Sequence, residues 1–203
     1  MSGRFTNYDD GDVRDLIRDY PLAWLCAADG QAEHAAQLPL LGEYNQGGSL
    51  THLLGHIPRH SPLMEPLSRN GRALVLFQGP QAYISPDQAG VRDWAPTWNF
   101  VHLRINAEVE FLPNETGSAI MALVERMERD RSTPWTIAEL GPRYPQMELA
   151  VIGFRARVLS VEGRFKLGQD EQPEVLQSIL DALGDTPLAD WMRRFSTRTR
   201  DRE

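Results

Sequence analysis

The chain has 203 residues, 41% of them hydrophobic and 24% charged, and its formal net charge is −7. This length and composition predict a globular protein with a sizeable core, and the acidic balance argues against a general binder of nucleic-acid phosphates, which needs clustered Lys and Arg. The one cysteine, Cys26, excludes an intrachain disulfide and a cysteine-rich metal site.

The sequence gives no sign of a membrane segment. No apolar run approaches the roughly 20 residues of a membrane helix, and the N-terminus has no apolar signal segment. We therefore expect a cytoplasmic protein that does not span a membrane.

The first 41 residues predict a helix followed by a hairpin. Acidic residues 9–12 precede apolar residues at helical spacing, and Pro21 ends this helix. Asp29 and Gly30 lie between two apolar segments, the second ending at Leu41, and an Asp-Gly pair in that position predicts a hairpin.

Two strands and a short helix are predicted next. Residues 50–57 and 73–77 are apolar runs of strand length. Between them, Ser61 is expected to cap a short helix with Pro62 in its first position. The Gly-Pro pair at 79–80 is expected to kink the strand that contains it.

The second half of the chain carries the clearest strand pattern. After a polar loop over 87–96, residues 98–111 alternate between apolar and polar side chains, which predicts a strand with one buried face. A helix over 115–130 follows. Residues 149–161 predict a last long strand, continued through a turn at 162–163.

The C-terminal part predicts two helices. Pro173 opens the first, and the second, shorter one contains Trp191, with a frayed tail from residue 197. We expect a barrel domain over 1–170 and a helical extension over 171–203. About six strands with helices at the edges predict an α+β, mainly β protein built on an antiparallel barrel.

Catalytic and metal motifs are missing from the sequence. His52, His56 and His60 are spaced four apart, but Gly55 and Pro58 break the helix that would align them, so no metal site is expected. On a strand, His52 and His56 share a face. Neither G-x-S-x-G nor a Walker A motif occurs, and no catalytic residues are assigned.

The remaining polar groups on strands and strand ends predict a site for a phosphorylated aromatic ligand. Arg59, next to the predicted helix start at Ser61, is placed to bind a phosphate, because guanidinium and helix N–H groups both favour an anion. Trp98 and Tyr83 are placed to flank a flat ring.

Five segments of the chain resemble one known family, the PaiB-type FMN-binding negative transcriptional regulators with the FMN-binding split-barrel fold. In chain order they are LIRDYPLAWL (16–25), LLGHIPRHSP (53–62), LVLFQGPQAYISP (74–86), APTWNF (95–100) and VEGRFKLGQD (161–170). The FQGPQAYISP and PTWN segments at this spacing are the most specific.

The resemblance implies a six-stranded split barrel and a homodimer with flavin pockets at the subunit interface. It also implies phosphate contacts from GHIPRHSP and ring contacts from PTWN. The residues expected to bind the cofactor are His56, Arg59, His60, Ser61, Gln78, Tyr83, Thr97, Trp98, Asn99, Lys166 and Gln169.

The chain departs from the family pattern at several positions. The family usually has asparagine at His60, serine at Gly168, asparagine at Asp170 and histidine at Arg104, and a tyrosine-rich loop where this chain has residues 87–90. Gly168 lacks a hydroxyl and Asp170 adds a negative charge, whereas Arg104 adds a positive one.

Two functions stay open at this point. The first is a regulatory FMN-binding protein, for which the acidic chain offers no element that reads DNA directly. The second is an FMN-dependent oxidoreductase, since a flavin transfers hydride with little help from protein side chains. A split barrel also accommodates another planar ligand such as haem, so the cofactor is expected to be FMN, with haem as the alternative.

Overall fold

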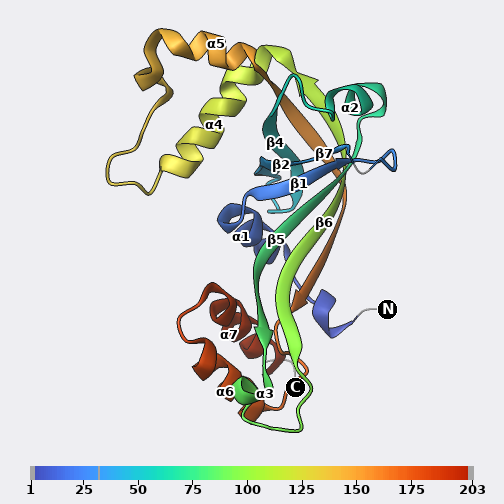
Figure 1. Cartoon of the computed structure of the whole chain (residues 1–203), viewed down its shortest axis with the longest axis vertical. Coiled ribbons are helices and arrows are strands. Elements are labelled where there is room, and N and C mark those ends of the chain that lie inside the picture. Colours follow the sequence, from blue (N-terminus) through green and yellow to red (C-terminus); the bar gives the residue numbers. More distant parts are fainter. Residues whose placement is uncertain (1–2, 32, 201–203) are drawn as a thin grey trace. The chain divides into compact units, whose positions relative to one another are not determined.

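The computed structural model describes residues 3–31 and 33–200, except for the side chains of 199 and 200. Its strands form one seven-stranded sheet in the order β2-β1-β5-β6-β7-β4-β3, with helices around it (Figure 1). The strands are β1 (Leu22–Ala27), β2 (Ala35–Pro39), β3 (Leu41–Tyr44), β4 (Leu50–Pro58), β5 (Arg72–Ile84), β6 (Thr97–Leu112) and β7 (Val151–Lys166).

The order of the strands shows that the sheet closes on itself. β2 and β3 stand at opposite ends of the order, yet only Leu40 separates them in the chain. The Cα atoms of Pro39 and Leu41, two residues apart, lie within about 7 Å of each other, whereas the two edges of a flat seven-stranded sheet would lie about 29 Å apart. The two edges therefore meet, which confirms the mainly β barrel. The number of strands is seven, not six: the apolar segment that ends at Leu41 supplies β2, and β3 begins at its last residue and continues to Tyr44.

Helices lie between and after the strands. They are α1 (Asp10–Asp19), α2 (Met64–Asn70), α3 (Pro86–Ala89), α4 (Thr116–Glu128), α5 (Tyr144–Leu149), α6 (Pro173–Leu183) and α7 (Pro187–Arg200), with the 3-10 turns η1 (Arg4–Thr6), η2 (Pro113–Glu115) and η3 (Ile137–Arg143). Among the described residues, none of these helices combines the length and apolar character that crossing a membrane requires.

The chain divides into two compact units. Unit 1 contains the chain up to Asp9, Gln78–Leu103 and the chain from Glu162 onward, whereas unit 2 contains Asp10–Phe77 and Arg104–Val161. The long strands β5, β6 and β7 contribute residues to both units.

The core of unit 2 lies between the inner faces of its strands and α4. Leu53 and Phe154 are fully buried, and β4 pairs antiparallel with β7 so that His56 stands opposite Gly153. A Cβ at Gly153 would lie 3.1 Å from Cα of Thr116. The glycine therefore lets α4 approach β7, and its backbone N–H donates a hydrogen bond of 3.0 Å to Oγ1 of Thr116.

The core of unit 1 is an aromatic cluster around the end of β7. The ring of Phe165 stacks on Tyr8 at 5.0 Å and on Phe195 at 5.2 Å between ring centroids. The predicted turn at 162–163 is wrong, because β7 continues through both residues. Gly163 serves close approach instead: a Cβ there would lie 2.7 Å from the Tyr8 ring, and its N–H donates to the Tyr8 hydroxyl at 2.8 Å.

Three local expectations need correction. The short helix predicted at Ser61 begins at Met64, because Ser61 and Pro62 form a separate turn in which Ser61 Oγ accepts from Leu63 N at 3.3 Å. The loop expected over 87–96 begins with the last residues of α3, which Ser85 caps through its hydroxyl. The frayed tail is helical as far as Arg200 within α7, and its last three residues lie outside the described part of the chain.

Candidate functional site

The candidate phosphate segment, residues 56–61, lies in unit 2 where β4 ends. Arg59 and His60 are exposed. The backbone N–H of Arg59 donates to the carbonyl of Ala150 at 3.0 Å, and its side-chain Nε donates to the carbonyl of Leu149 at 3.1 Å. These two bonds hold the backbone and Nε of Arg59 in place. The side chain is otherwise exposed, and an exposed guanidinium suits an anion.

His56, the first residue of this segment, is half-buried on β4. Burial lowers the pKa of its imidazole, so the ring is neutral near pH 7. Its Nδ1 is buried and has no hydrogen-bond partner among the residues that the structure describes. A buried polar atom without a partner is costly, and a hydrogen bond to a ligand would remove that cost.

Seven predicted residues lie in unit 1, and the structure brings two pairs of them together. The Lys166 ammonium donates a hydrogen bond to Oγ1 of Thr97. Lys166 is the only lysine in the chain. The rings of Tyr83 and Trp98 meet edge to face with centroids 6.1 Å apart, although 48% of Tyr83 and 53% of Trp98 are exposed. Two exposed aromatic faces fit a flat ring.

The amide side chains of unit 1 are used within the protein. Gln78 donates to the carbonyl of Val101 at 3.3 Å. Asn99 is buried and donates to Sδ of Met192 at 3.6 Å. Gln169 donates to the carbonyl of Phe165 at 2.6 Å and accepts from Leu167 N at 2.8 Å. In this arrangement the three amides hold backbone and core in place around the exposed groups.

The departures from the family pattern have a structural explanation in one case. Gly168 has φ of +81°, a left-handed conformation that strains other residues, and its carbonyl accepts from Glu171 N at 3.2 Å. The turn that Gln169 closes therefore requires glycine. Asp170 and Arg104 are both exposed.

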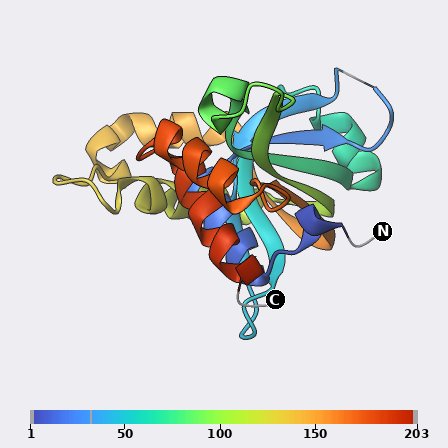
Figure 2. The same cartoon turned by 90° about the horizontal axis from the view of Figure 1, so that it is seen from below.

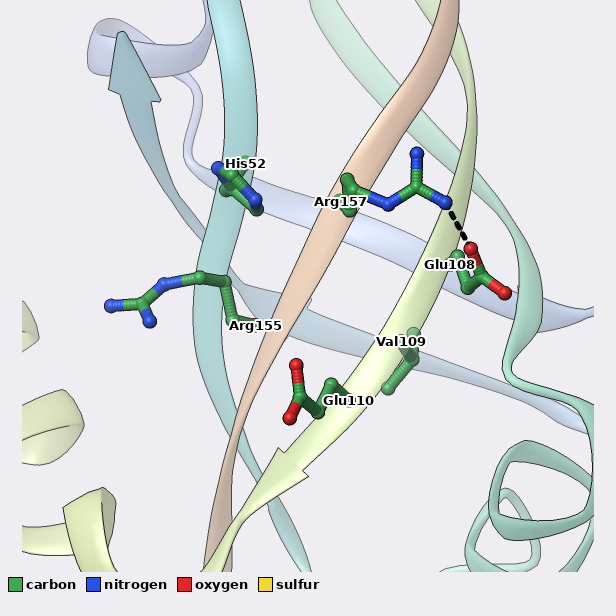
Figure 3. A pocket seen from close by; sticks show the side chains of 6 residues that line it. All are labelled: His52, Glu108, Val109, Glu110, Arg155 and Arg157. Atoms are coloured by element: carbon green, nitrogen blue, oxygen red, sulfur yellow. Dashed lines mark hydrogen bonds and ion pairs between the residues drawn. The ribbon is translucent and has the colours of Figure 1, made fainter.

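A charged cavity that the sequence did not predict lies on β4, β6 and β7 in unit 2 (Figure 3). Its volume is about 300 Å³, and its lining residues are His52, Glu108, Val109, Glu110, Arg155 and Arg157. Arg157 pairs with Glu108, and Arg155 Nε lies 2.8 Å from a carboxylate oxygen of Glu43. The alternating charges of β6 and β7 were the available signal.

The cavity is lined by charged side chains, of which the two arginines pair with Glu108 and Glu43. Glu43 and neighbouring carboxylates raise the pKa of Arg155, which stays charged. Because both guanidinium groups already face carboxylates, the cavity does not resemble an anion site. The part of the chain that the structure describes also holds no group of three His, Cys, Asp or Glu side chains suited to a metal ion.

The fold of the chain is found in several solved structures. It resembles the FAD and heme binding protein from Mycobacterium smegmatis (TM-score 0.56, 15% identity, 84% of this chain and 78% of that one). It also resembles the flavocytochrome Anf3 from Azotobacter vinelandii (TM-score 0.56, 12% identity, 78% and 68%). At these identities the likeness concerns the fold alone.

Sequence comparison reaches further. The chain is 26% identical to "Protease synthase and sporulation protein PAI 2" of Bacillus subtilis (strain 168) over 151 residues, 73% of this chain and 72% of the relative. The sequence pattern of the family described as "Putative FMN-binding domain" matches residues 1–160. The resemblance to PaiB-type proteins is thus confirmed, and the chain belongs to the family of putative FMN-binding domains.

Proposed function

We propose that this protein binds FMN and acts as a flavin-binding regulator. The observation that carries the proposal is the exposed aromatic pair Tyr83–Trp98 in a chain of the FMN-binding family. The same unit holds the Lys166 ammonium, which is hydrogen-bonded to Thr97. The aromatic faces suit the isoalloxazine ring, and the ammonium group suits its electron-rich edge.

The phosphate of FMN is assigned to the segment 56–61. Arg59 supplies an exposed guanidinium, and His60 and Ser61 follow it directly. The neutral ring of His56 would form a hydrogen bond with the ligand, and this bond would give the buried Nδ1 a partner. The remaining predicted residues Gln78, Asn99 and Gln169 would act indirectly: their hydrogen bonds hold backbone and core groups of unit 1 in place.

The regulatory role in this proposal does not include direct DNA binding. The net charge of −7 opposes association with a polyanion. A homodimer, with flavin at its interface, is part of the proposal and rests on the family. A cytoplasmic location is consistent with the single Cys26, because proteins of a reducing compartment do not depend on disulfides.

Calorimetric titration with FMN and with riboflavin tests this proposal. The two ligands share the ring and differ in the phosphate. We expect saturable binding of FMN, with riboflavin weaker by about 10- to 100-fold, because charge-assisted hydrogen bonds to a phosphate contribute about 1.5–3 kcal/mol. If neither ligand binds at micromolar concentration, the proposal is wrong.

A further inference from the structure

One side-chain hydrogen bond in unit 1 joins the loop that precedes β6 to the turn that follows β7. The indole Nε1 of Trp94 donates to a carboxylate oxygen of Glu171 at 2.9 Å, although the two residues lie 77 positions apart in the chain. The bond is partly buried, and a carboxylate acceptor makes a hydrogen bond roughly twice as strong as a neutral acceptor does. Neither residue belongs to the set expected to bind the cofactor.

The loop that carries Trp94 is held at its start as well. The helix α3, which precedes the loop, lies beside α6 (Figures 1 and 2). A Cβ at Gly90 would lie only 3.2 Å from Oγ of Ser178 on α6. The backbone N–H of Trp94 then donates to the carbonyl of Val91 at 3.3 Å. This turn places the indole three residues before Thr97, the first residue of β6.

Glu171 belongs to a turn whose backbone is closed by bonds of its own. Its N–H donates to the carbonyl of Gly168 at 3.2 Å. The side chain of Gln169 bonds to the backbone on both sides of Lys166, at 2.6 Å and 2.8 Å. The Glu171 carboxylate is therefore held in a fixed place relative to the end of β7.

A second bond joins the same two segments of the chain. The Lys166 ammonium donates to Oγ1 of Thr97. A lysine ammonium is a compact charge on a flexible stem with three rotatable donors, so a hydroxyl acceptor fixes its position only if the hydroxyl is itself held. The Trp94–Glu171 bond supplies that restraint, because it ties the chain just before Thr97 to the turn just after Lys166.

We infer that Trp94 and Glu171 are positioning residues, which keep the Lys166 ammonium at Thr97 and so fix where this charge meets the ligand. The inference rests on the proposed flavin site, to which Thr97 and Lys166 belong, and adds two residues that act on it without touching the ligand. Without the Trp94–Glu171 bond, the loop moves more freely against the turn, and the ammonium adopts several orientations in place of one.

Acylation of Lys166 tests the inference without any ligand, because the chain has no other lysine. Trp94→Phe keeps an aromatic ring and removes the donor, and Glu171→Leu removes the acceptor. In both variants an amine-reactive ester should acylate Lys166 severalfold faster, relative to the α-amino group, because the released amine reaches solvent more freely. Glu171→Gln should stay near the unmodified rate, since its amide oxygen still accepts from the indole.

The matched control is Glu174→Leu, because Glu174 is exposed in the first turn of α6 and has the same side chain as Glu171. This variant should leave the relative rate unchanged. Unchanged rates in Trp94→Phe and Glu171→Leu would overturn the inference. So would an equal acceleration in Glu171→Gln, which would assign the effect to the charge of Glu171 and not to its bond with the indole.

Calorimetric titration of the same variants with FMN gives a second readout. Trp94→Phe and Glu171→Leu should weaken FMN binding by about 3- to 10-fold, in keeping with the modest net contribution of one hydrogen bond. Glu171→Gln and Glu174→Leu should bind FMN as the unmodified protein does. Equal affinities in all of these proteins would refute the positioning role. If none of them binds FMN, the proposed function is wrong, and the acylation rates alone decide whether the bond positions Lys166.

Discussion

Arg59 has a structural contact and an exposed charge, and the two can be separated by experiment. Its Nε holds the carbonyl of Leu149, whereas the exposed end of the guanidinium is assigned to the FMN phosphate. Arg59→Ala should weaken FMN binding by about 10- to 100-fold and leave riboflavin binding nearly unchanged. Calorimetry of both ligands measures this difference.

The matched control for this variant is Arg72→Ala, which removes another exposed arginine of unit 2. It should bind both ligands as the unmodified protein does. If Arg59→Ala lost FMN and riboflavin equally, the arginine would act through the fold and the phosphate would lie elsewhere.

Lys166 allows an unusually selective chemical test because the chain has no other lysine. An amine-reactive ester can acylate only Lys166 and the α-amino group. We expect FMN to slow acylation of Lys166 severalfold, because the ligand would cover the ammonium that Thr97 holds. Mass spectrometry follows both sites, and the α-amino group serves as internal control. Equal rates with and without FMN would remove Lys166 from the site.

At the residue scale, the sequence shows which side chains are able to bind a ligand but not which contacts they make within the protein. Arg59, Tyr83 and Trp98 are exposed as a ligand site requires. The amide of Gln169 instead closes a backbone turn. The residue type indicates which hydrogen bonds a side chain can make. Whether the side chain bonds to a backbone group of the protein or stays available to a ligand depends on the fold.

At the scale of elements, alternation predicted β6 well, because one face of that strand is buried along most of its length. The turn predicted at Gly163 is wrong, because a glycine occurs both in turns and in strands that another side chain approaches closely, here the Tyr8 ring. The helix α5 was missed for a different reason: it buries none of its residues, so no apolar periodicity marks it in the sequence.

The role given to Gly163 predicts a loss of stability in Gly163→Ala. The added methyl group would lie 2.7 Å from the rings of Tyr8 and Phe165. Such crowding in a packed cluster costs about 1–3 kcal/mol of unfolding free energy. Urea unfolding measures it, with Gly3→Ala as control, because a Cβ at Gly3 meets nothing within 4 Å. Equal midpoints for the two variants would contradict the packing described around Tyr8.

At the scale of the whole molecule, two histidines predict how stability depends on pH. Burial lowers the pKa of His56, and burial together with Arg164 lowers the pKa of His102. The folded state therefore binds fewer protons than the unfolded state, whose histidines titrate near about 6.5. Stability from these groups is complete above that pH and is lost as the pH falls through it toward the lower folded values.

Thermal unfolding at several pH values tests this linkage. The melting temperature should fall between pH 7.5 and pH 5, and the fall should be smaller in His56→Asn, which cannot titrate. A double variant that also carries His102→Asn should reduce it further. An equally steep fall in the double variant would assign the pH dependence to other groups.

The whole molecule belongs to a family described by FMN binding, and the central claim is that this chain holds that cofactor. The most direct measurement is the visible spectrum of the protein after incubation with excess FMN and exhaustive dialysis, with mass analysis of what denaturation releases. We expect the bands of oxidised flavin and the release of FMN, at one molecule per chain. A protein that returns colourless from dialysis, or shows a Soret band as purified, would contradict it.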